Sequence, residues 1–165
     1  MRVAIIMGSL SDLNKVEPTI QILKDYGIKV DVRCLSAHRA HLELAEFVEE
    51  CNHNDTKVII AAAGMAAALP GVIASMTVLP VIGVPLSGSV LDGVDALYSI
   101  VQMPSGIPVA TVAINGTKNA AYLALEMIAL TSEEIKTKLL AHREQMHLDA
   151  KKANEQMIEK YEGEK

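Results

Sequence analysis

The sequence has no tryptophan, one phenylalanine and four tyrosines, so aromatic residues make up 3% of its 165 residues. A protein that binds single-stranded nucleic acid by stacking bases needs more aromatic rings than this. Basic residues do not dominate either, because 15 Lys and Arg stand against 20 Asp and Glu and the formal net charge is −5. No basic stripe is visible along the chain, and we therefore expect no nucleic-acid partner.

Cysteine is also scarce. Cys34 and Cys51 are the only two, and neither belongs to a Cys-x-x-Cys pair. Two cysteines in a chain of this length form no disulfide framework, so a reducing compartment is favoured. We expect both to be buried free thiols.

Long apolar runs are missing as well. Pro70, Pro80 and Pro85 interrupt the most apolar region, and no stretch approaches the roughly 18 apolar residues that a membrane span needs. The first run, residues 1–7, is too short for the core of a signal peptide and is ended by Gly8. These absences predict a cytoplasmic protein with no membrane partner.

What the sequence does contain is an ordinary globular composition, 50% apolar and 21% charged, in a length that suits one domain. Short apolar runs alternate with amphipathic stretches. The runs predict strands at 3–7, 28–35, 58–62, 81–84 and 109–114, and the stretches predict helices around 16–23, 44–51, 72–76, 94–101 and 120–130. This alternation predicts parallel βαβ units, and hence an α/β doubly wound sheet in three α/β/α layers.

Several local details accompany this prediction. Pro18 is expected near the start of the first helix or at a kink in it, Asn52 to Asp55 in a loop, and Pro85 at the end of the fourth strand. In the helix around 120–130, the 3.6-residue period places four apolar residues on one face. They are Ala120, Leu123, Met127 and Leu130.

The C-terminal part of the chain repeats apolar residues every three or four positions, with a strongly charged reverse side. The stripe is Ile135, Leu139, His142, Met146, Ala150, Ala153, Met157 and Tyr161. A five-stranded sheet needs no such extension. We expect residues 1–165 to form a single catalytic domain whose helix over 132–162 packs on a neighbouring subunit; the alternative is that it folds back on its own domain.

In a doubly wound sheet the ligand site lies at the C-terminal ends of the strands. The first loop there, Gly8-Ser9-Leu10-Ser11-Asp12, joins a strand to a helix N-terminus. Free backbone N–H groups and the helix dipole favour an anion at such a point, and Asp12 can accept hydrogen bonds from sugar hydroxyls. The simpler interpretation is a capped helix without a ligand, because the loop matches neither common nucleotide-binding glycine motif.

The second loop is Ser36-Ala37-His38-Arg39. Arg39 offers a planar fork that suits phosphate, and His38 can take and give a proton near neutral pH. A lone loop histidine is often only a surface residue or a helix cap. The third loop, residues 62–71, has no ionisable side chain and can contribute only amides and shape.

Metal chemistry is not expected. A metal site needs three or four ligands. His38 and His41 are three residues apart and could form a pair, but Glu43 and Cys34 are poor candidates for a third ligand. A Ser–His–Asp triad is likewise unsupported by the order of these residues.

These loops, taken together, resemble the N5-carboxyaminoimidazole ribonucleotide mutase family of purine biosynthesis, over roughly residues 2 to 130. The matching segments are residues 7–12, 36–39, 69–71, 79–85, 99–104, 106–114 and 119–121. The resemblance implies a flavodoxin-like fold, a homo-octamer with C-terminal helices reaching onto neighbours, and no metal, nucleotide cofactor or biotin.

The resemblance also implies roles for residues. Ser9, Asp12 and Arg39 match residues that bind the phosphate and ribose, and His38 matches the catalytic histidine. The remaining pocket residues would be Ser11, Ser36, Ala37, Gly64 and Leu69. The implied reaction is an isomerisation by decarboxylation and recarboxylation, with one histidine as general acid and base.

The chain departs from the family at three points. Met65 stands where the family has glycine, Ala68 where it has histidine, and Ala40-His41 where it has Thr-Pro. A positive φ at position 65 would strain a methionine, and His41 is a candidate to replace the lost imidazole in part. Alternatives left open are a carboxylase that uses free CO₂, a ribonucleotide- or flavin-binding module without turnover, and an assembly protein without an active site.

Overall fold

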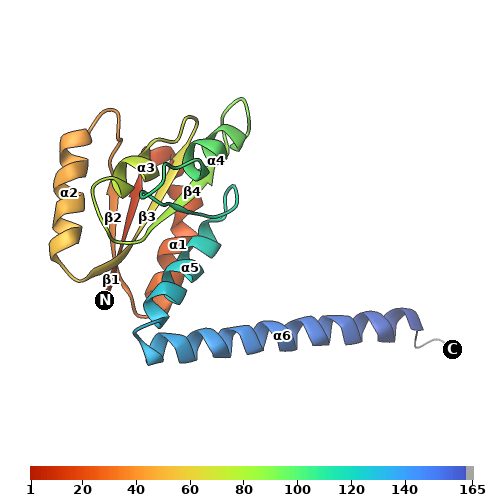
Figure 1. Ribbon diagram of the computed structural model, residues 1–165. Coiled ribbons are helices and arrows are strands. Elements are labelled where there is room, and N and C mark those ends of the chain that lie inside the picture. Colours follow the sequence, from red (N-terminus) through yellow and green to blue (C-terminus); the bar gives the residue numbers. More distant parts are fainter. Residues whose placement is uncertain (163–165) are drawn as a thin grey trace.

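The computed structural model describes residues 1–162 and contains one parallel sheet with the strand order β2-β1-β3-β4-β5 (Figure 1). The last three residues of the expected domain, 163–165, lie outside the described residues. The strands are β1 (Arg2–Met7), β2 (Lys29–Cys34), β3 (Thr56–Gly64), β4 (Val81–Leu86) and β5 (Ala110–Thr111). This order confirms the doubly wound flavodoxin-like sheet. The chain reverses direction across the sheet between β1 and β3, which is where such folds bind ligands.

Helices cover both faces of the sheet. They are α1 (Leu13–Asp25), α2 (His41–His53), α3 (Leu69–Ala74), α4 (Val94–Val101) and α5 (Thr117–Ala129), followed by α6 (Glu133–Glu162). A short 3₁₀ turn, η1 (Leu10–Asp12), precedes α1. One core cluster joins the sheet to α1, α5 and the start of α6, and the other joins it to α2, α3 and α4.

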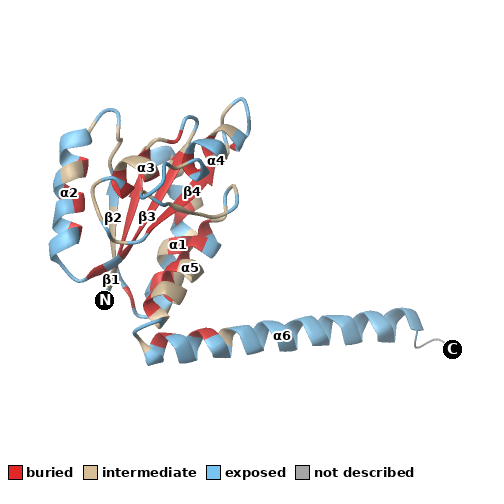
Figure 2. Cartoon of the chain, viewed as in Figure 1, coloured by how far each residue is buried: buried red, intermediate tan, exposed pale blue. Residues whose placement is uncertain are grey.

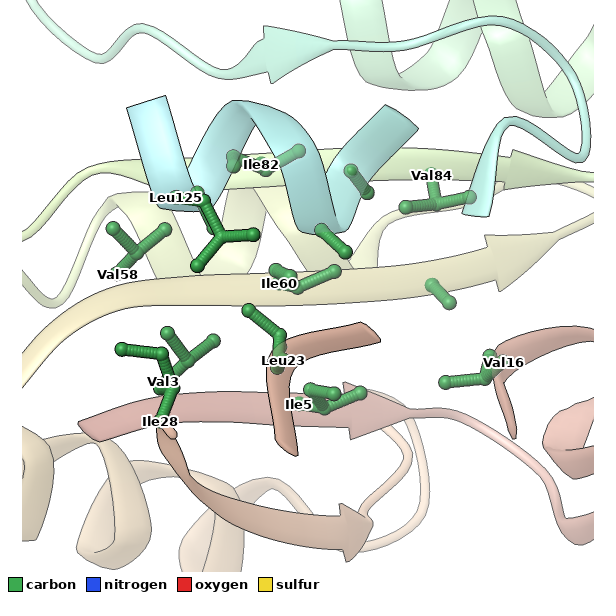
Figure 3. Packing of buried hydrophobic residues seen from close by; sticks show 14 of the residues in the cluster. Val3, Ile5, Val16, Leu23, Ile28, Val58, Ile60, Ile82, Val84 and Leu125 are labelled. Atoms are coloured by element: carbon green, nitrogen blue, oxygen red, sulfur yellow. The ribbon is translucent and has the colours of Figure 1, made fainter. Parts of the chain in front are cut away.

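Alternation along the strands assigns side chains to these two clusters. In β1, Val3 and Ile5 point toward α1 and α5, whereas Ala4 and Ile6 point toward α2 and α3. Figure 3 shows the first cluster, with Leu125 of α5 packed over the strands. Burying each large aliphatic side chain contributes about 1.5–3 kcal/mol. The sheet therefore gives the loops at its C-terminal edge a rigid base.

Two strands differ from their predicted lengths. Pro85 lies inside β4, opposite Ala63 of β3, and does not end it. The carbonyl of Pro85 accepts a hydrogen bond from the Asn115 N–H at 2.8 Å, on the side away from β3. Because the N and the carbonyl of one residue face the same side of a strand, the missing N–H removes no bond to β3. β5 pairs only at Ala110 and Thr111, so it is much shorter than predicted.

Other local predictions were also wrong. The loop predicted from Asn52 belongs to α2 as far as His53. Of the four residues predicted to share one face of α5, Ala120 is buried, Leu123 and Met127 are partly buried against the first core cluster, and Leu130 is exposed. The fully buried face of α5 is a different set of residues. It is instead formed by Thr117, Ala120, Ala121, Ala124, Leu125 and Ile128.

Two further residues bear on the predictions. Pro18 lies within α1, so the Asn14 carbonyl lacks its usual donor in the helix. Cys51 is a buried free thiol, as predicted, and burial raises its pKa. Cys34 is exposed, contrary to prediction, because it ends β2 at the edge of the sheet.

α6 leaves the domain as a long projecting helix (Figure 1). Only Ile135 and Leu139, near its start, are buried, and His142 stacks on Tyr122 of α5 with the rings 4.9 Å apart. Figure 2 shows the rest of α6 exposed. Among residues 1–162, no helix is both long enough and apolar enough to cross a membrane.

Candidate active site

A cleft of about 770 Å³ lies at the C-terminal edge of the sheet, where the loops after β1, β2, β3 and β4 meet. Its lining includes every residue that the family resemblance predicts for binding or catalysis. These are Ser9, Ser11, Asp12, Ser36, Ala37, His38, Arg39, Gly64 and Leu69. A cavity of about 880 Å³ opens elsewhere, beside the start of β4, but its lining contains no ionisable side chain. A third cavity, of about 560 Å³ between α5 and α6, has Glu126, His142 and Arg143 in its lining, but it contains none of the residues predicted for the site.

The loop after β1 presents a helix start to the cleft. Ser9 has extended backbone angles and caps η1, and its hydroxyl oxygen accepts hydrogen bonds from the Ser11 N–H at 3.3 Å and from the Ser11 hydroxyl at 2.8 Å. The Ser9 carbonyl accepts a bond from the Asp12 N–H at 3.2 Å. These bonds occupy the Ser11 and Asp12 N–H groups within the turn. The Ser9 hydroxyl, which accepts in both of its bonds, can still donate to an anion such as phosphate in the cleft beside the start of α1.

Asp12 supplies the carboxylate of the cleft. It is half-buried, and burial raises its pKa above the ordinary value, while the positive charge of Lys15 acts in the opposite direction. A partly desolvated carboxylate is a strong acceptor for hydroxyl groups. Asp12 is therefore equipped to hold sugar hydroxyls beside the anion-binding helix start.

The loop after β2 is held close to the first loop by backbone bonds. The Leu35 N–H donates to the Met7 carbonyl at 2.9 Å and so continues the β1–β2 pairing beyond the strand ends. The Ser36 carbonyl then accepts bonds from the N–H groups of Arg39 and Ala40, at 3.2 and 2.8 Å, which closes a tight turn.

Arg39 extends from this turn across to the loop after β1. Its Nη2 donates to the Gly8 carbonyl at 3.3 Å, and its Nε lies 3.5 Å from the Ser36 hydroxyl. The guanidinium group is thereby positioned near the start of η1. Two sources of positive potential, the helix start and Arg39, thus face the same part of the cleft.

His38 lines the cleft and is exposed. Among the described residues no side-chain hydrogen bond fixes its imidazole, so the ring is free to approach a bound molecule. An imidazole so placed can act on a bound molecule as general acid or general base.

The loop after β3 has a strained backbone. Met65 has φ +57°, the left-handed conformation, and the residue is 69% exposed. Tight turns follow, in which the Met65 and Ala66 carbonyls accept bonds from the N–H groups of Ala67 and Ala68, at 2.9 and 2.8 Å. A Cβ on Gly64 would lie 3.2 Å from the Leu86 carbonyl oxygen, so the loop lies close to the end of β4.

The structure adds four residues to the cleft that sequence reasoning missed, namely Lys15 of α1 and Ser87, Gly88 and Ser89 after β4. Lys15 Nζ donates to the Ser87 carbonyl at 2.6 Å. The position of this loop could have been predicted, because the fourth strand ends at the same sheet edge as the other three. The reach of Lys15 could not, because no local pattern indicates it.

His41 does not belong to the cleft lining, so its proposed replacement of a lost imidazole gains no support. Within residues 1–162, no group of three His, Cys, Asp or Glu side chains is arranged to hold a metal ion. The ionisable side chains of the cleft are Asp12, Lys15, His38 and Arg39.

Comparison with known proteins places this geometry in a family. The family model described as AIR carboxylase matches residues 2–149. An N5-carboxyaminoimidazole ribonucleotide mutase of Pyrococcus abyssi is 50% identical over 145 residues, covering 88% of this chain and 83% of that protein. The mutase of Methanocaldococcus jannaschii is 50% identical over 160 residues, covering 96% and 99%.

A solved structure agrees with these relatives. The crystal structure of Treponema denticola PurE superposes with a TM-score of 0.86 at 31% identity, covering 93% of this chain and 96% of that one. Fold, cleft and sequence identity lead to the same conclusion: the chain belongs to the AIR carboxylase family.

Proposed function

We propose that this protein is an isomerase of purine biosynthesis that converts N5-carboxyaminoimidazole ribonucleotide to 4-carboxy-5-aminoimidazole ribonucleotide. The observation that carries the proposal is the meeting of His38, Arg39, Ser9 and Asp12 in one cleft beside the β1–β3 switch point. The mutase names of relatives that are 50% identical support the same reaction.

The substrate is a nucleotide with a phosphate, a ribose and a small heterocycle. We place its phosphate at the start of η1, which Ser9 caps and where Arg39 reaches the Gly8 carbonyl, and its ribose hydroxyls on Asp12. The heterocycle then lies toward His38 and the loop after β3. The rest of the proposed pocket is formed by Ser11, Ser36, Ala37, Gly64 and Leu69.

His38 performs both proton transfers in this scheme. Its protonated ring donates to the exocyclic nitrogen of the substrate, the N–C bond of the carbamate breaks, and CO₂ is released beside an electron-rich ring. The ring carbon then attacks the CO₂. His38 removes the proton from that carbon and returns to its starting state, a contribution of about 10²–10⁴-fold in rate for general acid–base catalysis.

Confinement supplies much of the remaining acceleration. A CO₂ molecule held beside the ring reacts in an effectively unimolecular step, and well-oriented reactions of this kind reach effective concentrations of about 10⁵–10⁸ M. The chemistry needs no cofactor, because the protons circulate through one imidazole and the CO₂ is retained.

We further propose a cytoplasmic homo-octamer in which α6 packs on a neighbouring subunit. Support comes from the exposed part of α6, which leaves Met146, Met157 and Tyr161 uncovered within one chain. The proposed single catalytic domain is consistent with the two core clusters sharing one sheet.

Purified protein given each substrate, with and without bicarbonate, tests the reaction. We expect consumption of the carbamate without added bicarbonate. His38→Asn should retain nucleotide binding and lose at least 100-fold in turnover, because it removes the proton shuttle. Turnover that requires aminoimidazole ribonucleotide plus bicarbonate, with the carbamate untouched, would contradict the proposal.

The second candidate is an aminoimidazole ribonucleotide carboxylase that uses free CO₂. It is favoured by the altered loop after β3, where Met65 and Ala68 depart from the residues expected of the mutase. The same assay separates the two reactions. Binding of the nucleotide with neither activity would instead identify a binding module.

A further inference from the structure

Met65 lines the cleft and takes no part in the packing of either core cluster. It is 69% exposed and yet belongs to the cleft lining. The two core clusters do not include it. An apolar side chain that lines the cleft and belongs to neither core cluster is available to a ligand.

The backbone of Met65 makes this placement costly. Its φ of +57° is a conformation that glycine adopts freely and a side chain strains. The backbone conformation determines the direction of the Cα–Cβ bond of Met65, which lies where the cleft borders the end of β3. Such strained positions persist where the surrounding structure holds them, and they cluster at ligand-binding loops.

The residues that follow leave Met65 room to move. Ala66, Ala67 and Ala68 are small, and the cleft lining continues through all three. A methionine side chain has three rotatable bonds and a polarizable thioether, so it adapts its shape to what lies beneath it. His38, on the opposite loop, is exposed, and the cleft is therefore open to water in the free chain.

We propose that Met65 is an apolar cover that folds over the heterocycle end of the cleft and retains the CO₂ released there, which makes it a specificity-determining residue. This inference rests on the proposed function. CO₂ is small, uncharged and apolar, so an apolar cover retains it by excluding water without competing for its carbon. The loop has no ionisable side chain that would attract water in its place.

The cover determines whether the released CO₂ stays beside the ring or escapes. It does not change which bonds break and form. The electron pair of the broken N–C bond stays on the nitrogen, which takes a proton from His38. A ring electron pair forms the new C–C bond, and the ring proton returns to His38. If CO₂ escapes between these steps, aminoimidazole ribonucleotide is released instead of the carboxylated product.

The test measures how each variant divides the carbamate between carboxylated product and aminoimidazole ribonucleotide, after subtraction of spontaneous decarboxylation. Uptake of ¹³C-bicarbonate into the product is followed in parallel. Met65→Ala removes the thioether and keeps the backbone strain, Met65→Gly removes both, and Met65→Leu keeps apolar bulk. Leu42→Ala is the matched control, since Leu42 is 65% exposed on α2 and outside the cleft lining.

We expect Met65→Ala and Met65→Gly to release at least three times more aminoimidazole ribonucleotide per product than the wild type, and to take up correspondingly more label. Met65→Leu and Leu42→Ala should behave as the wild type. If the wild type turns over and both Met65→Ala and Met65→Gly divide the carbamate between the two products as the wild type does, Met65 is not a cover, while the proposed function stands. A wild type that consumes no carbamate overturns the proposed function and the cover with it.

Discussion

Lys15 Nζ donates a hydrogen bond of 2.6 Å to the backbone carbonyl of Ser87. The bond joins α1 to the loop after β4, two segments that are 72 residues apart in sequence and that both line the cleft. The same lysine lowers the pKa of Asp12, against the larger effect of burial. Lys15 therefore positions the loop after β4 at the cleft and favours the ionised form of Asp12.

Replacement of Lys15 by Met should weaken both the fold and substrate binding. Loss of the charge-assisted hydrogen bond costs about 1.5–3 kcal/mol of unfolding free energy. Because the loop after β4 then loses its link to α1 at the cleft, we expect KM to rise as well, with a smaller change in kcat. Steady-state kinetics and urea denaturation measure the two effects. Lys24→Met on the same helix is the matched control, because Lys24 is exposed and outside the cleft. Equal kinetics for both variants would refute the role.

Asp12 predicts a stability that depends on pH. Because burial raises its pKa in the folded state, the folded protein holds this proton to higher pH than the unfolded chain does. Ionisation of Asp12 therefore costs stability as pH rises from the unfolded pKa through the folded one. Asp12→Asn removes this cost, so its Tm relative to wild type should increase as pH rises from about 4, the ordinary pKa of an aspartate, through the raised pKa of the folded state, while substrate binding is lost. A difference in Tm that stays flat or falls over this window would contradict the assignment.

Much of the fold could be predicted because its signals are local. The β-branched run before Gly8 gives β1, and the prediction of a helix over 94–101 agrees with α4, Val94–Val101. The loops at the C-terminal edge follow from strand alternation alone, which is why the predicted residues share one cleft. The role of His38 in catalysis stays a prediction.

What the sequence could not reveal depends on neighbours in space. Pro85 reads as a strand end, yet it continues β4 because its missing N–H faces away from β3. Cys34 reads as a core residue, yet its strand lies at the sheet edge. The sequence predicts strain at Met65 only if its φ is positive, and the observed φ of +57° meets that condition.

Asn115 should contribute more to stability than its exposed position indicates. It has φ +57°, its Nδ2 donates to the Ser87 hydroxyl at 2.8 Å, and its Oδ1 accepts from the Ser87 N–H at 3.1 Å. Asn115→Gly loses two hydrogen bonds, about 1–2 kcal/mol of unfolding free energy. Asn115→Ala should lose about 1 kcal/mol more, because its Cβ is strained at that φ. Urea denaturation measures both variants.

Asp92→Gly provides the comparison for Asn115. Asp92 has φ +48° and is exposed, so the glycine relieves strain there without an equivalent pair of bonds to lose. We expect its unfolding free energy to stay equal to wild type or to rise. An Asn115→Gly variant as stable as Asp92→Gly would show that the bonds to Ser87 contribute nothing.

Truncation within α6 should separate folding from assembly. Ile135 and Leu139 are buried and His142 stacks on Tyr122, so removal of the whole helix would damage the domain itself. Removal of residues 148–165 keeps these contacts and deletes the last four residues of the apolar stripe, Ala150, Ala153, Met157 and Tyr161. We expect thermal unfolding to remain cooperative. The number of subunits, obtained as the light-scattering mass divided by the mass of the truncated chain, should fall below that of the full-length protein.

Charge substitutions test the same surface in the full-length chain. Met157 and Tyr161 are exposed and lie one turn apart on α6, so Met157→Glu with Tyr161→Glu places two carboxylates on the stripe. Lys152→Glu changes the net charge by the same amount on the opposite face. The double variant should dissociate and the control should not, because burying an unpaired carboxylate in an interface is strongly unfavourable. If both variants keep the mass of the wild type, this half of α6 does not hold the subunits together.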